Sequence, residues 1–225
     1  MKKDRVHKCI AASGIMSRRK AEEAIRQGRV SLNGEIFTDL GRTMDPAVDT
    51  VRIDGQEVRL TRGHRTFLFH KPRGVVTTKS DPEGRPTVMD YFRDLPGLNP
   101  VGRLDQDSEG LLLLTEDGDL LLRLTHPRFG VEKVYEVEVE GRGVPGYQER
   151  LCRGVELSDG PGKFVSLEPL KPERSFRVVV EEGRNRFVRR MFAAVGFTVR
   201  RLVRTRMGPF ELGTLAPGER QEVQS

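Results

Sequence analysis

Residues 101–118 have the sequence VGRLDQDSEGLLLLTEDG, in which a polar, turn-forming segment precedes a short apolar run and a second polar segment. The four leucines at 111–114 predict a strand that is buried on both faces, because neighbouring side chains of a strand point to opposite sides of the sheet. Asp117 is expected to cap a short helix that stops before Pro127. This stretch therefore predicts a buried strand within a sheet against which a helix packs.

The same alternation of strand and helix patterns continues from Thr66 onward and predicts a mixed, largely antiparallel sheet with flanking helices. Residues 133–140 alternate apolar and acidic positions, which places Tyr135 on the buried face of a strand. Residues 176–180 predict another strand. A helix beginning near Asn185 would bury its apolar side and present three arginines outward, toward phosphate or a carboxylate: Arg186, Arg189 and Arg190.

Residues 1–60 predict a separate small domain made of two helices followed by hairpins, so the fold class of the whole chain is α+β. Asp4 and Ser17 are expected to cap the two helices, because short polar side chains accept hydrogen bonds from free backbone amides there. Gly28 is expected to end the second helix in a left-handed turn.

Two tight hairpin turns are predicted at Asn33-Gly34 and Asp54-Gly55, since both residue pairs tolerate the positive φ angles that such turns need. Residues 61–65 contain a glycine and no apolar residue, so they are the predicted linker. The second domain is then expected to span residues 66–225.

The composition favours a cytoplasmic protein. Hydrophobic residues make up 36% of the chain, and no apolar run approaches the roughly 20 residues that a membrane helix needs. The first residues lack the apolar segment of a secretory signal. Cys9 and Cys152 lie far apart, in no metal-ligand spacing, which is typical of two reduced thiols.

Positive charge is concentrated near the carboxyl end. Residues 184–206 contain eight arginines and no acid, whereas the whole chain carries only +6. Such a concentration suits a polyanion, because cations that neutralise phosphates release condensed counterions. The charge pattern therefore predicts contact with a nucleic acid; the alternative is a solvated basic face.

Two residues are candidates for chemistry on their positions alone. Asp105 follows Arg103 by two residues, so in an extended segment both side chains point the same way at the lip of the buried strand. An isolated acid at a strand end is more often a turn former or an ion-pair partner. Tyr135 is a core tyrosine by default, and the alternative is a ring that stacks on an extruded base.

The amino-terminal pattern resembles a known RNA-binding module. Residues 15–25 (IMSRRKAEEAI) and 28–34 (GRVSLNG) are similar to the small domain named after a small-subunit ribosomal protein. The resemblance implies that five cations bind structured RNA: Arg18, Arg19, Lys20, Arg26 and Arg29.

The remainder resembles the ribosomal-type pseudouridine synthases that carry this amino-terminal domain. The resemblance rests on residues 101–118, with HKPRG at 70–74, KVY at 133–135 and EGRNRFVRRM at 182–191. It covers residues 6–218 and is closest to the B group of the large ribosomal subunit. It implies an enzyme that isomerises a uridine of ribosomal RNA, most closely that of the large subunit, to pseudouridine.

This resemblance also implies roles for individual residues. Asp105 matches the nucleophilic aspartate, and Arg189 matches the basic residue that pairs with it and keeps it charged. Tyr135 matches the aromatic residue that stacks on the uracil and assists proton removal. Arg103 matches the arginine that helps to hold the base in its flipped position. Two further arginines of the helix near Asn185 are expected to bind substrate: Arg186 and Arg190.

Isomerisation breaks the bond from ribose to ring nitrogen 1, turns the ring and forms a bond to carbon 5. It needs neither a redox step nor a group donor, so we expect no cofactor and no metal, and the sequence has no nucleotide-binding glycine motif or metal-ligand cluster. The expected partner is a ribosomal RNA stem-loop, with no membrane partner, and the expected state is a monomer.

Three alternatives remain open at this point. The chain could bind ribosomal RNA without catalysis, as an assembly factor. It could be a pseudouridine synthase that acts on the small-subunit RNA. It could be a hydrolase that uses paired carboxylates, Asp105 with Asp107 or Glu109, although their close spacing does not by itself place them on opposite sides of a bond.

Overall fold

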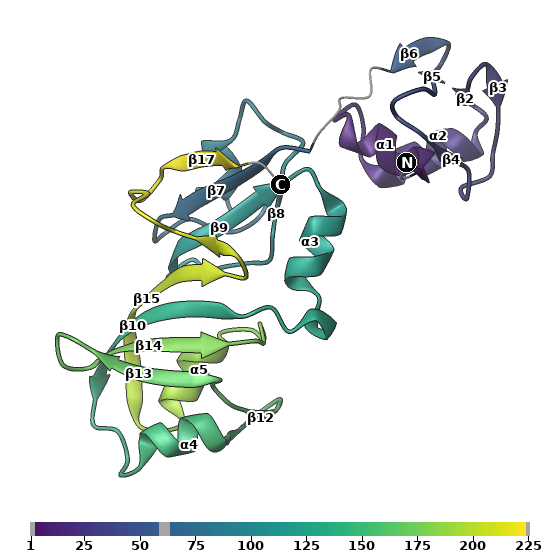
Figure 1. The fold of residues 1–225 in the computed structure, drawn as a ribbon. Helices are drawn as coiled ribbons and strands as arrows, with labels where there is room; N and C mark the ends of the chain where they lie inside the picture. Colours follow the sequence, from purple (N-terminus) through teal and green to yellow (C-terminus); the bar gives the residue numbers. More distant parts are fainter. Residues whose placement is uncertain (1–2, 59–63, 224–225) are drawn as a thin grey trace. The chain divides into compact units, whose positions relative to one another are not determined.

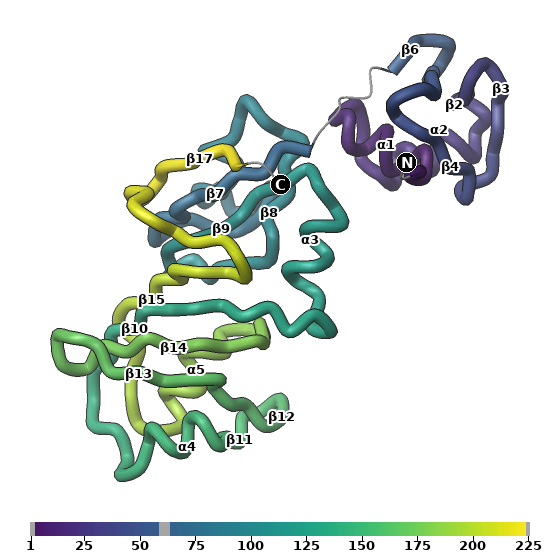
Figure 2. The backbone as a smooth tube through the Cα atoms, in the orientation of Figure 1, coloured from purple at the N-terminus to yellow at the C-terminus, as the bar shows by residue number. Residues whose placement is uncertain are grey.

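The computed structural model describes residues 3–58 and 64–223 of the 225-residue chain (Figures 1 and 2). The chain divides into two compact units, one formed by residues 1–65 together with residues 94–98 and the other by residues 66–93 and 99–224. The predicted linker at 61–65 falls largely outside the described residues, so the predicted domain boundaries stay a prediction. Each unit is described by itself below.

The first unit consists of two helices and a set of short strands. The helices and strands have these bounds: β1 Asp4–Arg5, α1 Val6–Ala12, α2 Arg18–Arg26, β2 Val30–Leu32, β3 Glu35–Ile36, β4 Thr43–Met44, β5 Val51–Ile53 and β6 Gln56–Val58. One hydrophobic core holds them together, and the apolar faces of α1 and α2 supply Ile10 and Ile25, both fully buried. The predicted helix-helix-hairpin order is confirmed.

The ends of the two helices are set differently. Ser17 caps α2 as predicted, accepting a hydrogen bond from the backbone N–H of Lys20 at 3.4 Å. The predicted Asp4 cap of α1 is wrong. Asp4 lies in β1, where it pairs with Met44, and α1 begins after Arg5 with no side-chain cap. The extended backbone that this strand pairing requires carries Asp4 out of reach of the first helical turn.

Both predicted hairpin turns are present. Asn33 and Gly34 have φ angles of 51° and 87° and connect β2 to β3, and Asp54 and Gly55 connect β5 to β6 with φ angles of 51° and 79°. Positive φ at both central residues is the geometry that matches the twist of a hairpin. The two hairpins join through β2 and β5 into a four-stranded sheet of order β3-β2-β5-β6.

The second unit is built around a larger sheet. Its elements are β7 Thr66–Lys71, η1 Val88–Tyr91, β8 Asn99–Pro100, β9 Glu109–Thr115, α3 Gly118–Thr125, η2 Pro127–Phe129, β10 Lys133–Gly141, α4 Tyr147–Arg153, β11 Val155–Leu157, β12 Gly160–Gly162, β13 Ser166–Leu170, β14 Ser175–Val180, α5 Phe187–Ala193, β15 Phe197–Met207, β16 Phe210–Glu211 and β17 Arg220–Val223. Its main path runs β13-β14-β10-β15-β9-β7-β17, with β8 and β16 attached at β9 and β15.

Strand β9 lies inside this sheet, as the leucine run predicts. Leu111, Leu112, Leu113 and Leu114 are all fully buried. β9 pairs antiparallel with β7 and parallel with β15. The other strand pairs of this sheet that the structure describes are antiparallel, so the sheet is mixed but mainly antiparallel. The C-terminal strand β17, yellow in Figure 2, runs beside β7 and covers its other edge.

A glycine permits the parallel contact between β9 and β15. Gly110 pairs with Arg204, and an ideal Cβ placed on Gly110 would lie 2.3 Å from the Arg204 carbonyl oxygen. Gly110 also has φ +105°, a conformation that L side chains rarely adopt. No other residue type fits at this crossing, which joins the segment carrying Asp105 to the arginine-rich strand.

Helices cover the sheet on both halves. Asp117 caps α3 as predicted, accepting hydrogen bonds from the backbone N–H groups of Asp119 and Leu120, and α3 ends before Pro127. On the other half, α4 and α5 lie beside β13, β14 and β10 (Figure 1), and α4 was not predicted. Among the described residues, no helix has the length and apolar character needed to cross a membrane.

Candidate active site

The segment that precedes β9 forms a tight turn around Asp105. The backbone N–H of Ser108 donates to the carbonyl oxygen of Asp105 at 3.0 Å. Thr77 supports the turn from the side, since its hydroxyl donates to the Leu104 carbonyl at 2.8 Å and accepts from the Leu104 N–H at 3.2 Å. The backbone position of Asp105 is therefore set by the turn itself and by the hydrogen bonds that join its neighbour Leu104 to a distant segment.

Lys71, at the end of β7, provides a second support for this turn. Its side chain is fully buried, and Nζ donates to the carbonyl oxygens of Ser108 at 2.8 Å and Pro72 at 2.9 Å. Burial lowers the pKa of Lys71 to about 8, although the negative charges of Asp105 and Asp107 act in the opposite direction. The HKPRG segment thus places a buried cation directly under the Asp105 turn.

Asp105 itself lies at the wall of a cavity of about 650 Å³. Its side chain is 28% exposed, and its Oδ2 lies 3.8 Å from Nη1 of Arg186. The carboxylate is therefore open to a ligand in the cavity while a cation stands beside it.

Asp107 binds two arginines, Arg186 and Arg189. Arg186 binds both carboxylate oxygens of Asp107, at 3.1 and 3.0 Å, and Arg189 approaches Oδ2 at 3.4 Å. Burial acts to raise the pKa of Asp107, but the hydrogen bonds from Arg186 and the charge of Arg189 outweigh it, so the pKa is lowered. Asp107 is thus an ionised anchor for both guanidinium groups.

Arg189 was expected to pair with Asp105. In the structure Arg186 forms the ion pair with Asp105, and Arg189 pairs with Asp107. The Arg189 side chain is only 10% exposed and donates to the carbonyl oxygens of Asp107 at 2.9 Å and Val199 at 3.1 Å. Arg186 precedes α5, where φ of +50° directs it out of the helix. Arg189 therefore binds the backbone of the turn and approaches the Asp107 carboxylate, and its predicted catalytic role stays a prediction.

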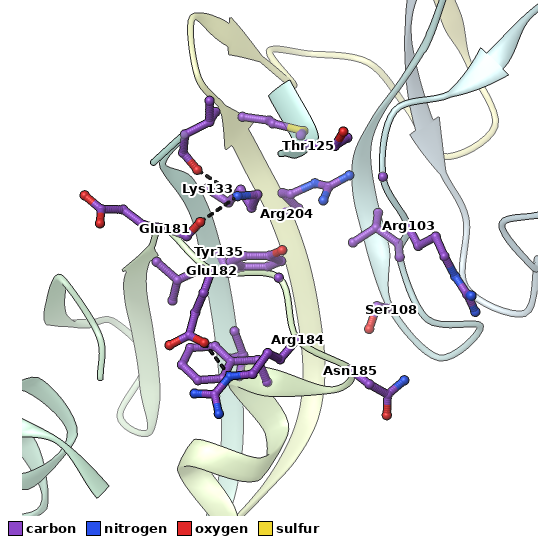
Figure 3. Close-up of a pocket in the computed structure, with 18 of the residues that line it drawn as sticks. Arg103, Ser108, Thr125, Lys133, Tyr135, Glu181, Glu182, Arg184, Asn185 and Arg204 are labelled. Carbon is purple, nitrogen blue, oxygen red and sulfur yellow. Dashed lines mark hydrogen bonds and ion pairs between the residues drawn. The ribbon is translucent and has the colours of Figure 1, made fainter. Parts of the chain in front are cut away.

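Tyr135 lines the cavity across from Arg103 and Ser108 (Figure 3). Its side chain is largely buried, and its ring faces the cavity from β10 (Figure 3). Lys133, two residues earlier, lines the same wall, and its Nζ donates to the carbonyl oxygens of Val131 at 2.7 Å and Glu181 at 3.0 Å. Burial lowers the pKa of Lys133, and the charge of nearby Arg204 lowers it further.

Two predicted substrate-binding arginines lie away from the centre of this cavity. Arg103 belongs to the lining but is exposed, and its guanidinium points away from Tyr135 (Figure 3). Arg190 is absent from the lining and binds both carboxylate oxygens of Asp159, at 2.8 and 2.9 Å. Arg186 is the one of the three that contacts the Asp105 carboxylate.

The arginine-rich segment is largely neutralised by acids from other elements. Seven of its eight arginines form ion pairs, although the segment itself contains no acid; the pairs are Arg184 with Asp159 and Glu182, Arg186 and Arg189 with Asp107, Arg190 with Asp159, Arg200 with Glu140, Arg201 with Glu109 and Glu138, and Arg206 with Glu132. The predicted concentration of free positive charge is therefore much reduced in the folded protein.

Arg204 is the exception, and residue patterns gave no reason to single it out. Its side chain is 2% exposed, no described acid pairs with it, and Nε donates to the Leu111 carbonyl at 2.7 Å. It lines the cavity, and its Nη2 is buried without a hydrogen-bond partner among the described residues. Its pairing with Tyr135 across β10 and β15 was the signal that could have identified it, but strand register is not visible in the sequence.

The predicted RNA-binding cations of the first unit are all exposed. Two of them form ion pairs: Arg18 with Glu22 at 3.4 Å and Arg29 with Asp54 through Nε at 2.8 Å. The other three, Arg19, Lys20 and Arg26, lie on α2 and form no ion pair with a described residue. Within the part of the chain that is described, no group of three His, Cys, Asp or Glu residues could hold a metal ion.

Comparisons with known proteins agree with this two-part organisation. Residues 65–194 match the model of the RNA pseudouridylate synthase family, and residues 4–47 match that of the S4 domain.

The chain is 42% identical to an uncharacterized RNA pseudouridine synthase of Mycobacterium tuberculosis, covering 98% of this chain and 90% of the relative. It is 38% identical to the ribosomal large subunit pseudouridine synthase B of Bacillus subtilis, covering 98% and 92%. A crystal structure of a pseudouridylate synthase superimposes with a TM-score of 0.68 at 31% identity, covering 98% of this chain and 96% of that one. The chain therefore belongs to the RNA pseudouridine synthases and carries an S4 domain ahead of its catalytic unit.

Proposed function

We propose that this chain converts a uridine of large-subunit ribosomal RNA to pseudouridine, with Asp105 as the nucleophile. The observation that carries the proposal is that Asp105 and Tyr135 line the same cavity of about 650 Å³. The volume lies within the range of small-molecule sites, as an extruded nucleotide requires. The assignment to the large-subunit RNA is supported by relatives named for that substrate, among them the enzyme of Bacillus subtilis.

In this proposal, the cavity receives the target base after it has left the RNA stack. Unstacking costs a few kcal/mol, which stacking on an aromatic ring can offset. Tyr135 supplies that ring. Its position among buried groups, with an 8% exposed side chain, also keeps water from the base while it is detached from the ribose.

Arg186 and Arg189 divide the task of supporting Asp105. Arg186, whose Nη1 lies 3.8 Å from Oδ2 of Asp105, is the cation that orients this carboxylate. Arg189 acts as a positioning residue, because its hydrogen bonds hold the Asp107 carbonyl and the Ser108 hydroxyl of the turn. Arg103 is exposed and therefore free to move toward the RNA, where it would occupy the space that the flipped base leaves.

The first unit is the proposed grip on the surrounding RNA. The S4 match covers α1 and α2, and α2 carries exposed cations that suit phosphate oxygens. Arg18, Arg19, Lys20, Arg26 and Arg29 are the residues to which we assign this role.

The test is to incubate the protein separately with large-subunit and small-subunit ribosomal RNA and to map pseudouridine by carbodiimide adducts. Wild type is expected to modify large-subunit RNA, and Asp105→Asn to lose at least about 10⁴-fold in rate with RNA affinity within about threefold, since loss of a nucleophile removes the reaction path. Glu173→Gln, an exposed carboxylate in the β13–β14 turn, serves as control.

Three outcomes would contradict the proposal. Tight binding without any pseudouridine would indicate an assembly factor, and product confined to small-subunit RNA would overturn the substrate assignment. Residual Asp105→Asn turnover within tenfold of wild type would overturn the role of the nucleophile.

A further inference from the structure

Arg204 is a buried cation that has no counter-ion among the described residues, in contrast to the other arginines of residues 184–206. Burial of an unpaired guanidinium is costly, because the donor loses its hydrogen bonds to water. Nε is satisfied by the Leu111 carbonyl at 2.7 Å, whereas Nη2 has no partner among the described residues. A buried donor of this kind, in the wall of a cavity, indicates that its partner comes with the ligand.

The pairing of the strands sets the orientation of the Arg204 side chain. It pairs with Tyr135 on β10, and a register shift between Val134 and Tyr135 leaves Thr205 of β15 as an extra residue beside it. Such a bulge redirects side chains. The guanidinium of Arg204 and the hydroxyl of Tyr135 point to the same side, toward the segment that carries Arg103 and Ser108 (Figure 3).

The surroundings favour an oxygen acceptor that gains negative charge. Two buried cations, Lys133 and Arg204, line the cavity, and a third, Lys71, is buried against the Asp105 turn without lining the cavity. Both lysine ammonium groups are already bound to backbone carbonyls. Of the cavity-lining cations that the structure describes, Arg204 has a buried nitrogen, Nη2, with no hydrogen-bond partner.

We propose that Nη2 of Arg204 donates a hydrogen bond to a ring carbonyl oxygen of the flipped uracil and stabilises the negative charge that this oxygen gains during isomerisation. The proposal rests on the proposed function. When the bond from ribose to nitrogen 1 breaks, its electron pair stays with the ring and spreads to the carbonyl oxygens. Attack of a carboxylate on the ring also places charge on a carbonyl oxygen, so the role of Arg204 is the same in either route.

The test compares single-turnover rates and RNA affinities of wild type, Arg204→Gln and Arg204→Lys. We expect the rate constant of Arg204→Gln to fall about 100-fold, as for loss of one preorganised donor, and the Kd for RNA to change less than about threefold. Arg204→Lys should recover little, because an ammonium lacks the planar fork. Arg177→Gln, an exposed arginine of the neighbouring strand β14, should keep the wild-type rate.

Chemical rescue separates this role from a folding defect. Guanidinium ion at millimolar concentration should restore part of the rate to Arg204→Ala, and urea at the same concentration should not. Thermal unfolding of each variant checks that it is folded under the assay conditions.

Three results would overturn the proposal. The first is an Arg204→Gln rate within threefold of wild type. The second is a loss of RNA affinity together with a decrease of about one in the slope of log affinity against log salt concentration, which would assign the donor to a phosphate. The third is a folded Arg204→Ala that guanidinium does not rescue. A wild type that makes no pseudouridine on any RNA would instead overturn the proposed function, and this inference with it.

Discussion

Two basic regions of this protein use their charge in opposite ways. Helix α2 carries Arg19, Lys20 and Arg26 exposed and without ion pairs to described residues. Residues 184–206 contain more arginines, yet seven of the eight are paired with acids from other elements, and the eighth is buried. Positive charge in a sequence is therefore not equivalent to positive charge on a surface.

The difference follows from where the neighbours come from. A short surface helix meets mainly its own residues, so the charge of its exposed face can be inferred from its sequence. The arginines of β15 lie in the middle of a sheet, and their partners are supplied by β9 and β10, which are 63 to 92 residues away for Arg201. The exposed cations of α2 are therefore suited to binding phosphates, whereas the arginines of residues 184–206 are suited to holding the segments around the cavity together.

The largest effect is expected where β9 meets the arginine-rich strand. Gly110→Ala would place a Cβ 2.3 Å from the Arg204 carbonyl oxygen, so the two strands must separate. We expect the free energy of unfolding to fall by about 3 kcal/mol or more, measured by urea unfolding.

Gly34→Ala is the matched control for this prediction. Gly34 also has a positive φ, but nothing lies within 4 Å of its ideal Cβ, so only the backbone strain of about 1 kcal/mol is expected. Equal losses for the two variants would contradict the assignment of a close strand contact to Gly110.

An intermediate effect is expected from the buried cation under the Asp105 turn. The pKa of Lys71 is lowered from 10.5 to about 8, so between these pH values the unfolded chain binds the additional proton. Stability should therefore rise with pH in this window, by up to about 1 kcal/mol per pH unit. Lys71→Met should lack this rise in urea unfolding followed from pH 8 to 10.5.

Lys163→Met, which removes an exposed lysine, is the control for this pH dependence. Its curve should run parallel to that of wild type. A Lys71→Met curve parallel to wild type as well would contradict the depressed pKa of Lys71.

The smallest effect is expected on the exposed helix. Arg19→Gln or Arg26→Gln should each lower the slope of log affinity against log salt by about one and weaken RNA binding severalfold at moderate salt. Arg200→Gln, whose guanidinium already pairs with Glu140, should change the slope less. RNA titrations between about 50 and 200 mM salt measure these slopes. An Arg200 variant whose slope falls as much as the slopes of the α2 variants would contradict the comparison.

Many features of the fold were predictable because they depend on neighbours within a few residues. Ser17 and Asp117 cap helices through hydrogen bonds that span two or three residues. The alternation of residues 133–140 set the buried face of β10. Asp4 was predicted wrongly, since its pairing with Met44 overrides its capping tendency.

The candidate site was predictable only in part. The motif led to Asp105 and Tyr135, which the fold brings to one cavity. It did not indicate that Arg186 rather than Arg189 stands next to Asp105, because this depends on the left-handed backbone before α5. Lys71 lies in the HKPRG motif and Arg204 in the arginine-rich segment, but neither pattern indicated that the side chain would be buried at this site.

The sequence by itself determined the elements, their caps and turns, the family and the aspartate at the centre of the proposed chemistry. Only the tertiary structure decided which cations lie near that aspartate and which of them has no acidic partner among the described residues. The physical reason is that capping, turn geometry and strand alternation act over a few residues. The contacts of Asp107 with Arg186, and of Gly110 and Leu111 with Arg204, instead join residues 79 or more positions apart through the order and register of a nine-stranded sheet.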